Sequence, residues 1–249
     1  MNDLFKKLTS IDQKSDKLDL LIEKLNRLEK TNSLNTTKIF DTYALNLLQP
    51  LMNGYPLLPF TSRSLRPSAL ITILNDIVAN RRTRIMEFGS GISTIMMARL
   101  IKRNQLNTEV ITVENDEKWS NLLIELLKKE DLDQFVKIIC APLAECDLAL
   151  ESSQWYDRTN ITTEISNKTF DLLLVDGPSA FESGQEKSRY PALPYLFDQL
   201  YANCSIYLSN ASRKGEAFVL QCWEEQFSLK FQLKGGNLAH CSRGKASLF

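Results

Sequence analysis

The sequence predicts an α/β protein with a mostly parallel sheet, helices on both faces and one antiparallel strand added at the end. Three observations indicate this class. From residue 84 onward, short apolar runs alternate with segments whose apolar residues recur at helical spacing. The apolar runs are nearly continuous, which is typical of parallel strands buried on both faces. Gly235-Gly236 separates two strand-like runs and predicts a final antiparallel hairpin.

The individual elements follow in chain order. Pro67 can open the first helix of the domain, because its fixed φ suits the first helical turn. Strands are expected at 84–88, 110–113, 135–140, 170–175 and 205–208, and in the hairpin of 227–233 and 237–241. Helices are expected at 93–102, 119–127, 193–200 and 216–227. The alternation of the two kinds of element predicts parallel strands joined by helical crossovers.

The first thirty residues differ from the rest of the chain. On a charged background, their apolar residues follow a heptad repeat: Leu4, Ile11, Leu18, Leu21, Leu25 and Leu28. This pattern predicts a short coiled coil through which copies of the chain associate, and the alternative is one amphipathic helix lying on its own domain. The polar run 31–37 is expected to be a linker. We therefore divide the chain into a helix (1–30), a linker and helical segment (31–58) and the main domain (59–249).

Composition excludes several classes of function. Thirty basic and thirty acidic residues cancel, so no overall field attracts nucleic acid, and we expect no nucleic-acid partner. No run is apolar for the roughly 18 residues that a spanning helix needs, and the N-terminus lacks an apolar leader. We therefore expect a cytoplasmic protein without a membrane span. Five cysteines without a CxxC pair argue against a disulfide framework and against a zinc site.

The segment Ile85 to Thr94 carries the strongest signal for a ligand site. It reads Ile-Met-Glu-Phe-Gly-Ser-Gly-Ile-Ser-Thr, where a strand ends and a helix begins. Gly89 permits a tight turn, and Gly91 lets a ligand approach the backbone. Ser93 or Thr94 can cap the helix, whose N-terminus favours an anionic group. The order of strand, turn and helix is what a nucleoside-binding turn requires.

Acidic residues follow two further strands. Glu114 ends the strand Ile111-Thr112-Val113, where a carboxylate can accept both hydroxyls of a ribose. Asp176 ends the buried strand that begins at Phe170, and ligands in open α/β sheets bind over such carboxyl ends. Asp176 is therefore expected to face the reactive side of a cofactor, and capping the Gly177-Pro178 turn is its alternative role.

Together these segments resemble the class I S-adenosylmethionine (SAM)-dependent methyltransferases. More narrowly, the chain resembles a bacterial group with a Gly-Ser-Gly-x-Ser-Thr turn and Val-Asp-Gly-Pro after a central strand. Further similarities are Ser64-Leu65-Arg66-Pro67, Ala141-Pro142-Leu143, Trp155-Tyr156-Asp157 and the run from Arg189 to Pro194. The resemblance covers about 59–249 and implies a Rossmann-like sheet of seven strands, the last antiparallel.

The resemblance also implies how SAM is bound. Glu87, Gly89 and Gly91 would hold its methionine end, Glu114 its ribose, and the segment 141–143 its adenine. The expected cofactor-binding residues are Glu87, Gly89, Ser90, Gly91, Ser93, Glu114, Asn115, Pro142, Leu143 and Asp176. In metal-dependent relatives, carboxylates at the ends of such strands hold Mg²⁺. Here Ser209-Asn210 stands where relatives often carry two aspartates, so we expect no required metal.

The expected activity is methyl transfer to a hydroxyl of a small molecule or glycan, with Asp176 and Asp157 as candidate bases. His240 lies in the predicted last hairpin and is expected to be structural, and Arg189 either orients an anionic acceptor or holds a loop.

Two other functions stay open. A non-catalytic assembly protein would use residues 1–30 to bind a partner, and an NAD-dependent oxidoreductase would share the glycine turn. Thr94 at the third glycine position of the dinucleotide fingerprint disfavours the oxidoreductase.

Overall fold

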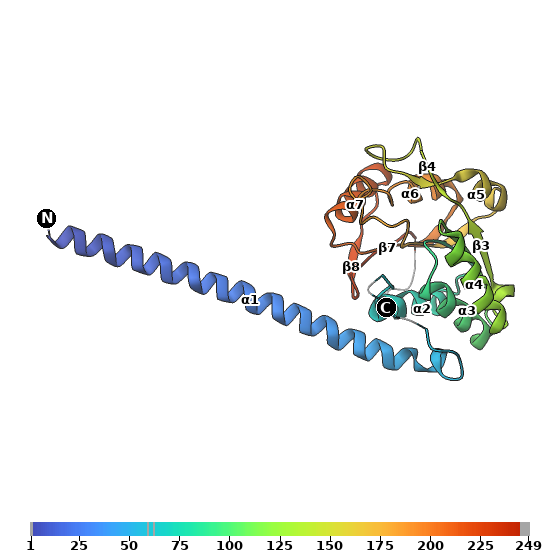
Figure 1. Ribbon diagram of the computed structural model, residues 1–249, viewed down its shortest axis with the longest axis horizontal. Helices are drawn as coiled ribbons and strands as arrows, with labels where there is room; N and C mark the ends of the chain where they lie inside the picture. Colours follow the sequence, from blue (N-terminus) through green and yellow to red (C-terminus); the bar gives the residue numbers. More distant parts are fainter. Residues whose placement is uncertain (1, 59, 62, 245–249) are drawn as a thin grey trace.

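A long helix and one α/β domain make up the chain (Figure 1). The structure, a computed structural model, describes residues 2–58, 60–61 and 63–244, with side chains from residue 21 onward except that of residue 30. Helix α1 spans Asn2–Met52 and projects from the domain over most of its length. Within the described residues, no helix is long and apolar enough to cross a bilayer.

The domain is built on one sheet with the strand order β3-β2-β1-β6-β7-β9-β8. Its strands are β1 (Arg84–Phe88), β2 (Glu109–Glu114), β3 (Val136–Cys140), β6 (Phe170–Val175), β7 (Leu200–Ser209), β8 (Gln232–Lys234) and β9 (Leu238–Ser242). All neighbouring pairs up to β7 are parallel, and β9 runs antiparallel to both β7 and β8. The predicted fold class is confirmed, including the seven strands and the antiparallel strand at the end.

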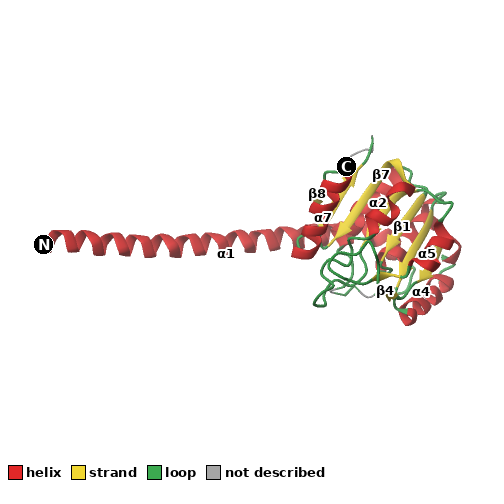
Figure 2. Cartoon of the chain, turned by 90° about the horizontal axis from the view of Figure 1, so that it is seen from above, coloured by secondary structure: helices red, strands yellow, loops and turns green. Residues whose placement is uncertain are grey.

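Helices cover both faces of this sheet (Figure 2). One face is covered by α2 (Pro67–Ala79), α3 (Ile92–Asn104) and α4 (Glu117–Lys129), and the other by α5 (Arg158–Ile165), α6 (Ala192–Leu196) and α7 (Lys214–Phe227). Short 3₁₀ turns, η1 (Asp133–Phe135) and η2 (Phe197–Gln199), precede β3 and β7, and a separate ribbon pairs β4 (Leu143–Ala144) with β5 (Trp155–Tyr156). The sequence did not predict this ribbon or α5.

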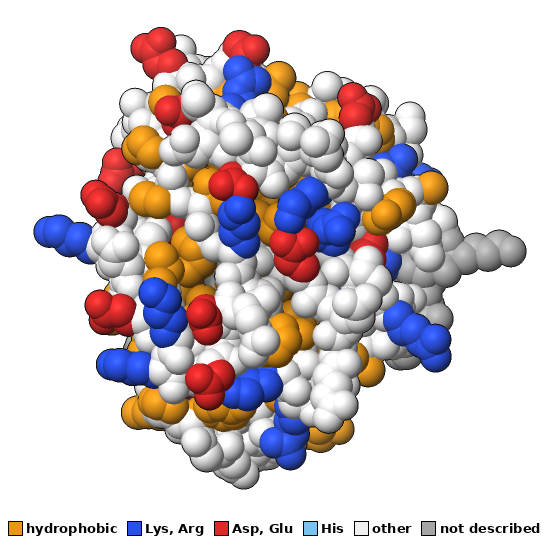
Figure 3. All heavy atoms as spheres, turned by 90° about the vertical axis from the view of Figure 1, so that its right-hand side faces the viewer, with side chains coloured by type: hydrophobic (Ala, Val, Ile, Leu, Met, Phe, Trp, Pro, Cys, Tyr) orange, Lys and Arg blue, Asp and Glu red, His pale blue; other side chains and the backbone are white. Residues whose placement is uncertain are grey.

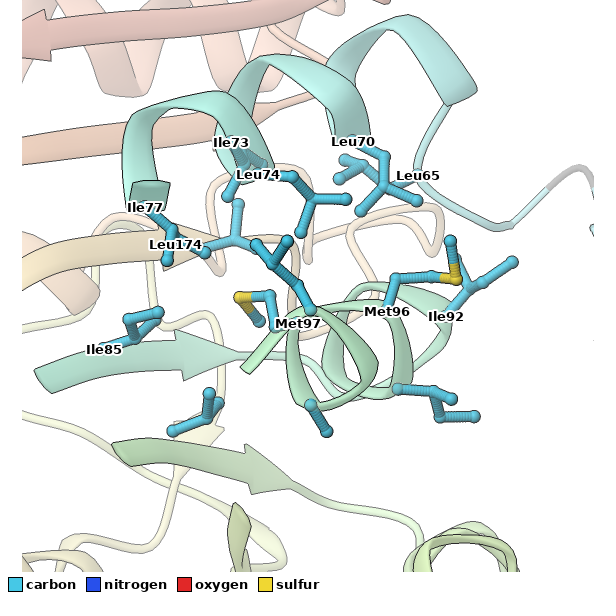
Figure 4. Close-up of a cluster of buried hydrophobic side chains, with 14 of the residues drawn as sticks. Leu65, Leu70, Ile73, Leu74, Ile77, Ile85, Ile92, Met96, Met97 and Leu174 are labelled. Carbon is cyan, nitrogen blue, oxygen red and sulfur yellow. The ribbon is translucent and has the colours of Figure 1, made fainter. Parts of the chain in front are cut away.

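Two apolar cores result from the period-2 geometry of the strands. In β6, Leu172 and Leu174 belong to the core under α2 and α3, whereas Leu173 and Val175 belong to the core under α5 to α7. Figure 4 shows the first core, in which side chains of α2 and α3 meet those of β1 and β6. A nearly continuous apolar strand is therefore needed, as the sequence indicated.

The segment 31–37 corrects the predicted linker, because it lies inside α1. Residues 2–49 contain neither glycine nor proline, so nothing forces the helix to end. The hydroxyls of Thr31 and Thr37 donate to the carbonyl oxygens four residues earlier, each at 2.8 Å. Polar composition alone therefore misled the prediction, and the helix runs through the boundary between 1–30 and 31–58.

The C-terminal end of α1 is built into the domain by a buried ion pair. Ala44, Leu48 and Leu51 are buried at the foot of the helix. Arg99 of α3 is fully buried, pairs with Glu130 at 2.7 Å and donates to the carbonyl oxygen of Leu51 at 3.2 Å. A cation at this end satisfies carbonyl groups that have no partner within the helix.

Charges of both signs are mixed on the face of the domain shown in Figure 3. The picture agrees with the equal numbers of basic and acidic residues in the chain. This face presents no broad region of one sign that would attract a polyanion.

We expect Arg99→Met to lower the free energy of unfolding by about 3–5 kcal/mol, because it leaves the buried carboxylate of Glu130 without its cation. Urea denaturation followed by circular dichroism would measure the change. Arg103→Met is the matched control: its exposed guanidinium donates to the Pro50 carbonyl at 2.9 Å, and its loss should cost less than about 1 kcal/mol. Equal losses in the two variants would contradict this account of the anchor.

Candidate active site

The candidate site lies where the parallel strands end. Because β1, β2, β3, β6 and β7 point the same way, their carboxyl ends meet at one edge of the sheet. This edge brings together the glycine turn after β1, Glu114 at the end of β2 and Asp176 just after β6. Most of the residues that the sequence singled out are therefore neighbours in space.

The glycine turn is locked against the end of β6. The carbonyl oxygen of Phe88 accepts from the backbone N–H groups of Asp176 at 2.8 Å and Gly177 at 2.7 Å. Gly89 has a φ of +92°, and a Cβ there would lie 2.6 Å from the Gly177 nitrogen. Only glycine fits this crossing, in both conformation and space. The tight turn predicted for Gly89 is thus present.

Gly91 has a different surrounding. A Cβ added at this position would meet nothing within 4 Å. Gly91 immediately precedes α3, whose first N–H groups have no partner within the helix. The space beside the Gly91 backbone is therefore open, and the approach of a ligand to it stays a prediction.

Glu87 is a buried carboxylate that holds the start of α3. It accepts hydrogen bonds from the hydroxyls of Ser93 at 2.5 Å and Thr94 at 2.6 Å. The N-cap of α3 is Gly91, so the prediction that Ser93 or Thr94 caps the helix is wrong, and both lie inside its first turn. Thr94, the third helical residue, accepts from the N–H of Gly91 at 3.0 Å. Burial raises the pKa of Glu87 to about 7, and the Ser93 and Thr94 hydroxyls limit the rise. Through these hydrogen bonds, Glu87 and Ser93 stabilise the glycine turn from its buried side.

Glu114 ties the end of β2 to the glycine turn. One carboxylate oxygen accepts from the hydroxyl of Ser90 at 2.8 Å and from its N–H at 3.2 Å. The other accepts from the N–H groups of Asn115 at 2.8 Å and Asp116 at 3.0 Å. The carboxylate is therefore held at the strand end, where the sequence expected it to meet a ribose.

Asp176 lies in a polar cluster with β7. Its carboxylate accepts a hydrogen bond from the Ser209 hydroxyl and lies 3.7 Å from the guanidinium of Arg189. Burial raises the pKa of Asp176, while Arg189 and Ser209 counteract part of the rise. A carboxyl whose pKa is raised is a stronger base once ionised, which suits proton removal from a hydroxyl.

The guanidinium of Arg189 occupies the space between the ends of β6 and β7. It is buried and donates to the Ser209 hydroxyl at 2.9 Å and to the backbone carbonyls of Pro178 and Ser209 at 3.2 and 3.1 Å. It also lies 3.5 Å from the buried carboxylate of Glu216. Of the two roles left open, the structure shows the second, a loop held by Arg189.

These residues do not fit a divalent metal. Asp176 is the one carboxylate among the residues at 176, 209 and 210, and the fixed cation of Arg189 stands beside it. Within the described residues, no group of three or more His, Cys, Asp or Glu side chains could hold a metal ion. Mg²⁺ prefers several oxygen ligands and would be repelled by the guanidinium.

The segment expected to meet adenine follows β3. Pro142 is exposed, and its carbonyl oxygen accepts from the N–H of Asp157 at 2.8 Å. Leu143 pairs with Tyr156 in the β4–β5 ribbon. Asp157 caps α5, and its hydrogen bonds from the N–H and the hydroxyl of Thr159 lower the pKa of its carboxyl. Asp157 therefore lies near this segment and is a weaker base than Asp176.

Two aromatic residues at the site are not among those predicted from the sequence. The indole of Trp119 donates to the carbonyl oxygen of Ser90 at 3.2 Å and so holds the glycine turn. Tyr156 stacks on Phe88 with ring centroids 5.9 Å apart, and a Cβ on Gly177 would lie 2.3 Å from its hydroxyl. Burial raises the pKa of Tyr156, so its phenol is neutral near pH 7. The Trp155-Tyr156-Asp157 run was the one signal for this position.

His240 lies away from these residues, on β9. Its ring stacks on Tyr207 with centroids 4.6 Å apart, and Nε2 lies 3.2 Å from the Ser205 hydroxyl. Burial lowers the pKa of His240, so the ring is neutral near pH 7. The predicted structural role of this histidine agrees with its packing.

A family profile described as a methyltransferase domain matches residues 86–210, half of the chain. The chain belongs to this methyltransferase family. The matched residues run from β1 through the end of β7 and contain every strand end of the site. Membership is consistent with SAM as the cofactor, as the sequence predicted. A search of curated proteins gave no significant match.

Solved structures show the same fold at low sequence identity. A protein from Staphylococcus aureus described as a caffeoyl-CoA O-methyltransferase has a TM-score of 0.56 and 15% identity over 82% of this methyltransferase and 99% of that chain. Cofactor-bound Rv0187 from MTB has a TM-score of 0.51 and 15% identity over 81% and 88% of the two chains. A protein from Klebsiella pneumoniae described as an O-methyltransferase has a TM-score of 0.50 and 15% identity over 83% and 90%.

We expect Glu87→Gln to remove part of the pH dependence of stability. Because the pKa of Glu87 is raised, the native methyltransferase loses free energy of unfolding as the pH rises from 4.5 to about 7. Relative to it, the variant should gain on the order of 2–3 kcal/mol across that interval. Urea denaturation at a series of pH values measures the difference.

Glu109→Gln is the control of opposite sign. Partial burial acts to raise the pKa of Glu109, but Lys168 and Arg84 outweigh it and lower the pKa. This variant should therefore lose stability relative to the native protein as the pH rises toward 4.5, and the two curves should run nearly parallel from there to pH 7. Parallel curves for Glu87→Gln and the native protein would show that Glu87 ionises as freely in the fold as in the unfolded chain.

Proposed function

We propose that this methyltransferase transfers the methyl group of SAM to a hydroxyl of a small molecule or glycan. The observation that carries the proposal is the pairing of an open glycine turn at Gly91 with the fixed carboxylate of Glu114 on the neighbouring strand. The structural neighbours described as O-methyltransferases support the choice of a hydroxyl acceptor. The proposal includes the cytoplasm as its place of action and self-association through residues 1–30.

The residues present fit SAM. The turn Gly89-Ser90-Gly91 would hold the methionine end, with Glu87 and Ser93 fixing the turn from below. Glu114 and Asn115 would hold the ribose, and Pro142 and Leu143 would border the adenine. SAM supplies an electrophilic methyl group when bound. The chain would align the acceptor with this methyl group. Asp176, expected on the reactive side of the cofactor, would act as the base.

Two features favour the second candidate function, a non-catalytic assembly protein. The projecting part of α1 offers a long surface for a partner, and Ser209 stands where relatives often have an acid. The oxidoreductase alternative is weaker, because Thr94 bonds Glu87 where the dinucleotide fingerprint needs glycine. Binding measurements with SAM and NAD distinguish a SAM-binding protein from an oxidoreductase, and an assay of methyl transfer distinguishes catalysis from assembly.

We expect the native protein to bind SAM and S-adenosylhomocysteine with micromolar dissociation constants, and Glu114→Gln to weaken both by about tenfold or more, because an amide accepts fewer hydrogen bonds from a ribose than a carboxylate does. Isothermal titration measures the affinities, with NAD as the competing ligand. Glu117→Gln, an exposed carboxyl in the first turn of α4, is the control and should bind normally. Absence of SAM binding to the native protein would leave the assembly function as the better account.

We expect Asp176→Asn to reduce the rate of methyl transfer by about 100-fold or more, because it removes the base next to the acceptor. Formation of S-adenosylhomocysteine from SAM, in the presence of a panel of phenolic and sugar hydroxyl acceptors, would measure it. Asp157→Asn is the comparison, since asparagine also caps helices and α5 should stay intact. A larger loss in Asp157→Asn than in Asp176→Asn would move the base to the start of α5.

A further inference from the structure

The heptad residues of α1, here called the apolar stripe, are exposed where their side chains are described. These residues are Leu21, Leu25, Leu28 and Ile39. Leu25 is 58% exposed and Ile39 is 68% exposed, and Leu21, Ile22 and Leu28 are similarly uncovered. The helix projects from the domain along this stretch (Figure 1). The alternative of an amphipathic helix lying on its own domain therefore fails for residues 21–39. Leu4, Ile11 and Leu18 of the same repeat have side chains outside the described residues.

The stripe also points away from the domain to which α1 is attached. The residues that anchor the helix are Ala44, Leu48 and Leu51. At about 100° per residue, these three lie on the side of the helix opposite to Leu25, Leu28 and Ile39. A second helix can therefore lie along the stripe without meeting the first domain.

The continuous helix extends the heptad repeat beyond residue 30. Seven residues after Leu25 comes Asn32, and seven after that comes Ile39, so both occupy the same heptad position as Leu25. An asparagine at this position can fix the register and number of strands in a coiled coil, because each amide pairs with its counterpart. Asn35, seven residues after Leu28, adds a second polar layer next to it in the seam. The polar run 31–37, which suggested a linker, thus contains a residue that can specify a two-stranded pairing.

Charges beside the stripe indicate the direction of pairing. The positions just before the heptad residues 18, 25 and 39 are Lys17, Lys24 and Lys38. In an antiparallel pair these positions face each other, and lysine would meet lysine. In a parallel pair, Lys24 of one copy faces the position five residues later in the other, which is Glu29. Within the described part of the chain, neither Lys24 nor Glu29 has an ion-pair partner in its own copy.

We infer that two copies of this methyltransferase associate through a parallel, two-stranded coiled coil of α1, with Leu25, Leu28 and Ile39 in the seam, Asn32 against Asn32, and Lys24 paired with Glu29 of the second copy. Both domains then lie at the same end of the coil, on its outer sides. The inference extends the proposed self-association but does not depend on SAM binding or on catalysis.

The stoichiometry is tested by light scattering during size exclusion and by sedimentation equilibrium over a dilution series. The native chain should have twice its mass of 28.4 kDa. Leu25→Lys with Leu28→Lys should give a monomer that binds SAM as the native chain does. Leu34→Lys, an equally exposed leucine outside the stripe, should stay a dimer. A monomeric native chain, a trimer or tetramer, or an unchanged dimer in the double variant would overturn the inference.

The direction is tested by exchanging charges. Lys24→Glu and Glu29→Lys should each weaken the dimer by about fivefold, because each brings like charges together across both symmetric contacts. A mixture of the two variants should form heterodimers in preference to either homodimer, and a chain with both substitutions should regain native affinity. Equal affinity of all variants, or a stronger Lys24→Glu homodimer as in an antiparallel pair, would overturn the parallel arrangement.

Discussion

The site depends on one crossing of backbones, where Phe88 and Gly89 at the end of β1 touch Asp176 and Gly177 at the end of β6. The Phe88 carbonyl accepts two N–H groups there, and neither glycine position has room for a side chain. Ser90 then reaches Glu114 of β2, and Asp176 reaches Ser209 of β7. Four strand ends are thus fixed relative to one another before any ligand is bound, which is the preorganisation that catalysis by alignment requires.

Local pattern was enough to predict the strands, the order of strand and helix, and the tight turn at Gly89, because these follow from apolar periodicity and from the steric demands of a turn. Individual side-chain contacts could not be predicted this way. The contact of Glu87 with Ser93 and Thr94, the indole bond of Trp119 and the burial of Tyr156 each depend on tertiary packing. The segment 31–37 shows that local pattern can also predict a loop where the chain forms a helix. Its polar residues have only weak preferences against a helix, and the flanking helical sequence decides.

Buried charge is arranged differently on the two sides of the site. Around Glu87, hydroxyl groups and burial are the main influences, and the carboxyl is half ionised near pH 7. Around Asp176, two arginines and a second acid form a compensated cluster, in which Arg189 and Arg213 approach Glu216 at 3.5 and 3.2 Å. A fixed cation of this kind cannot dissociate as a metal ion can. The positive charge next to the proposed base therefore does not depend on the binding of an ion. The same guanidinium of Arg189 also holds the loop after β6 in place.

The anchor at Arg99 has a mechanical consequence. Residues 2–49 contain no helix breaker, and the last turns of α1 are packed into the domain. The projecting part of the helix therefore continues without a break into the part that is anchored. At 1.5 Å per residue, its 51 residues span about 75 Å. The N-terminal end of α1 therefore lies far from the strand ends at which the site is built.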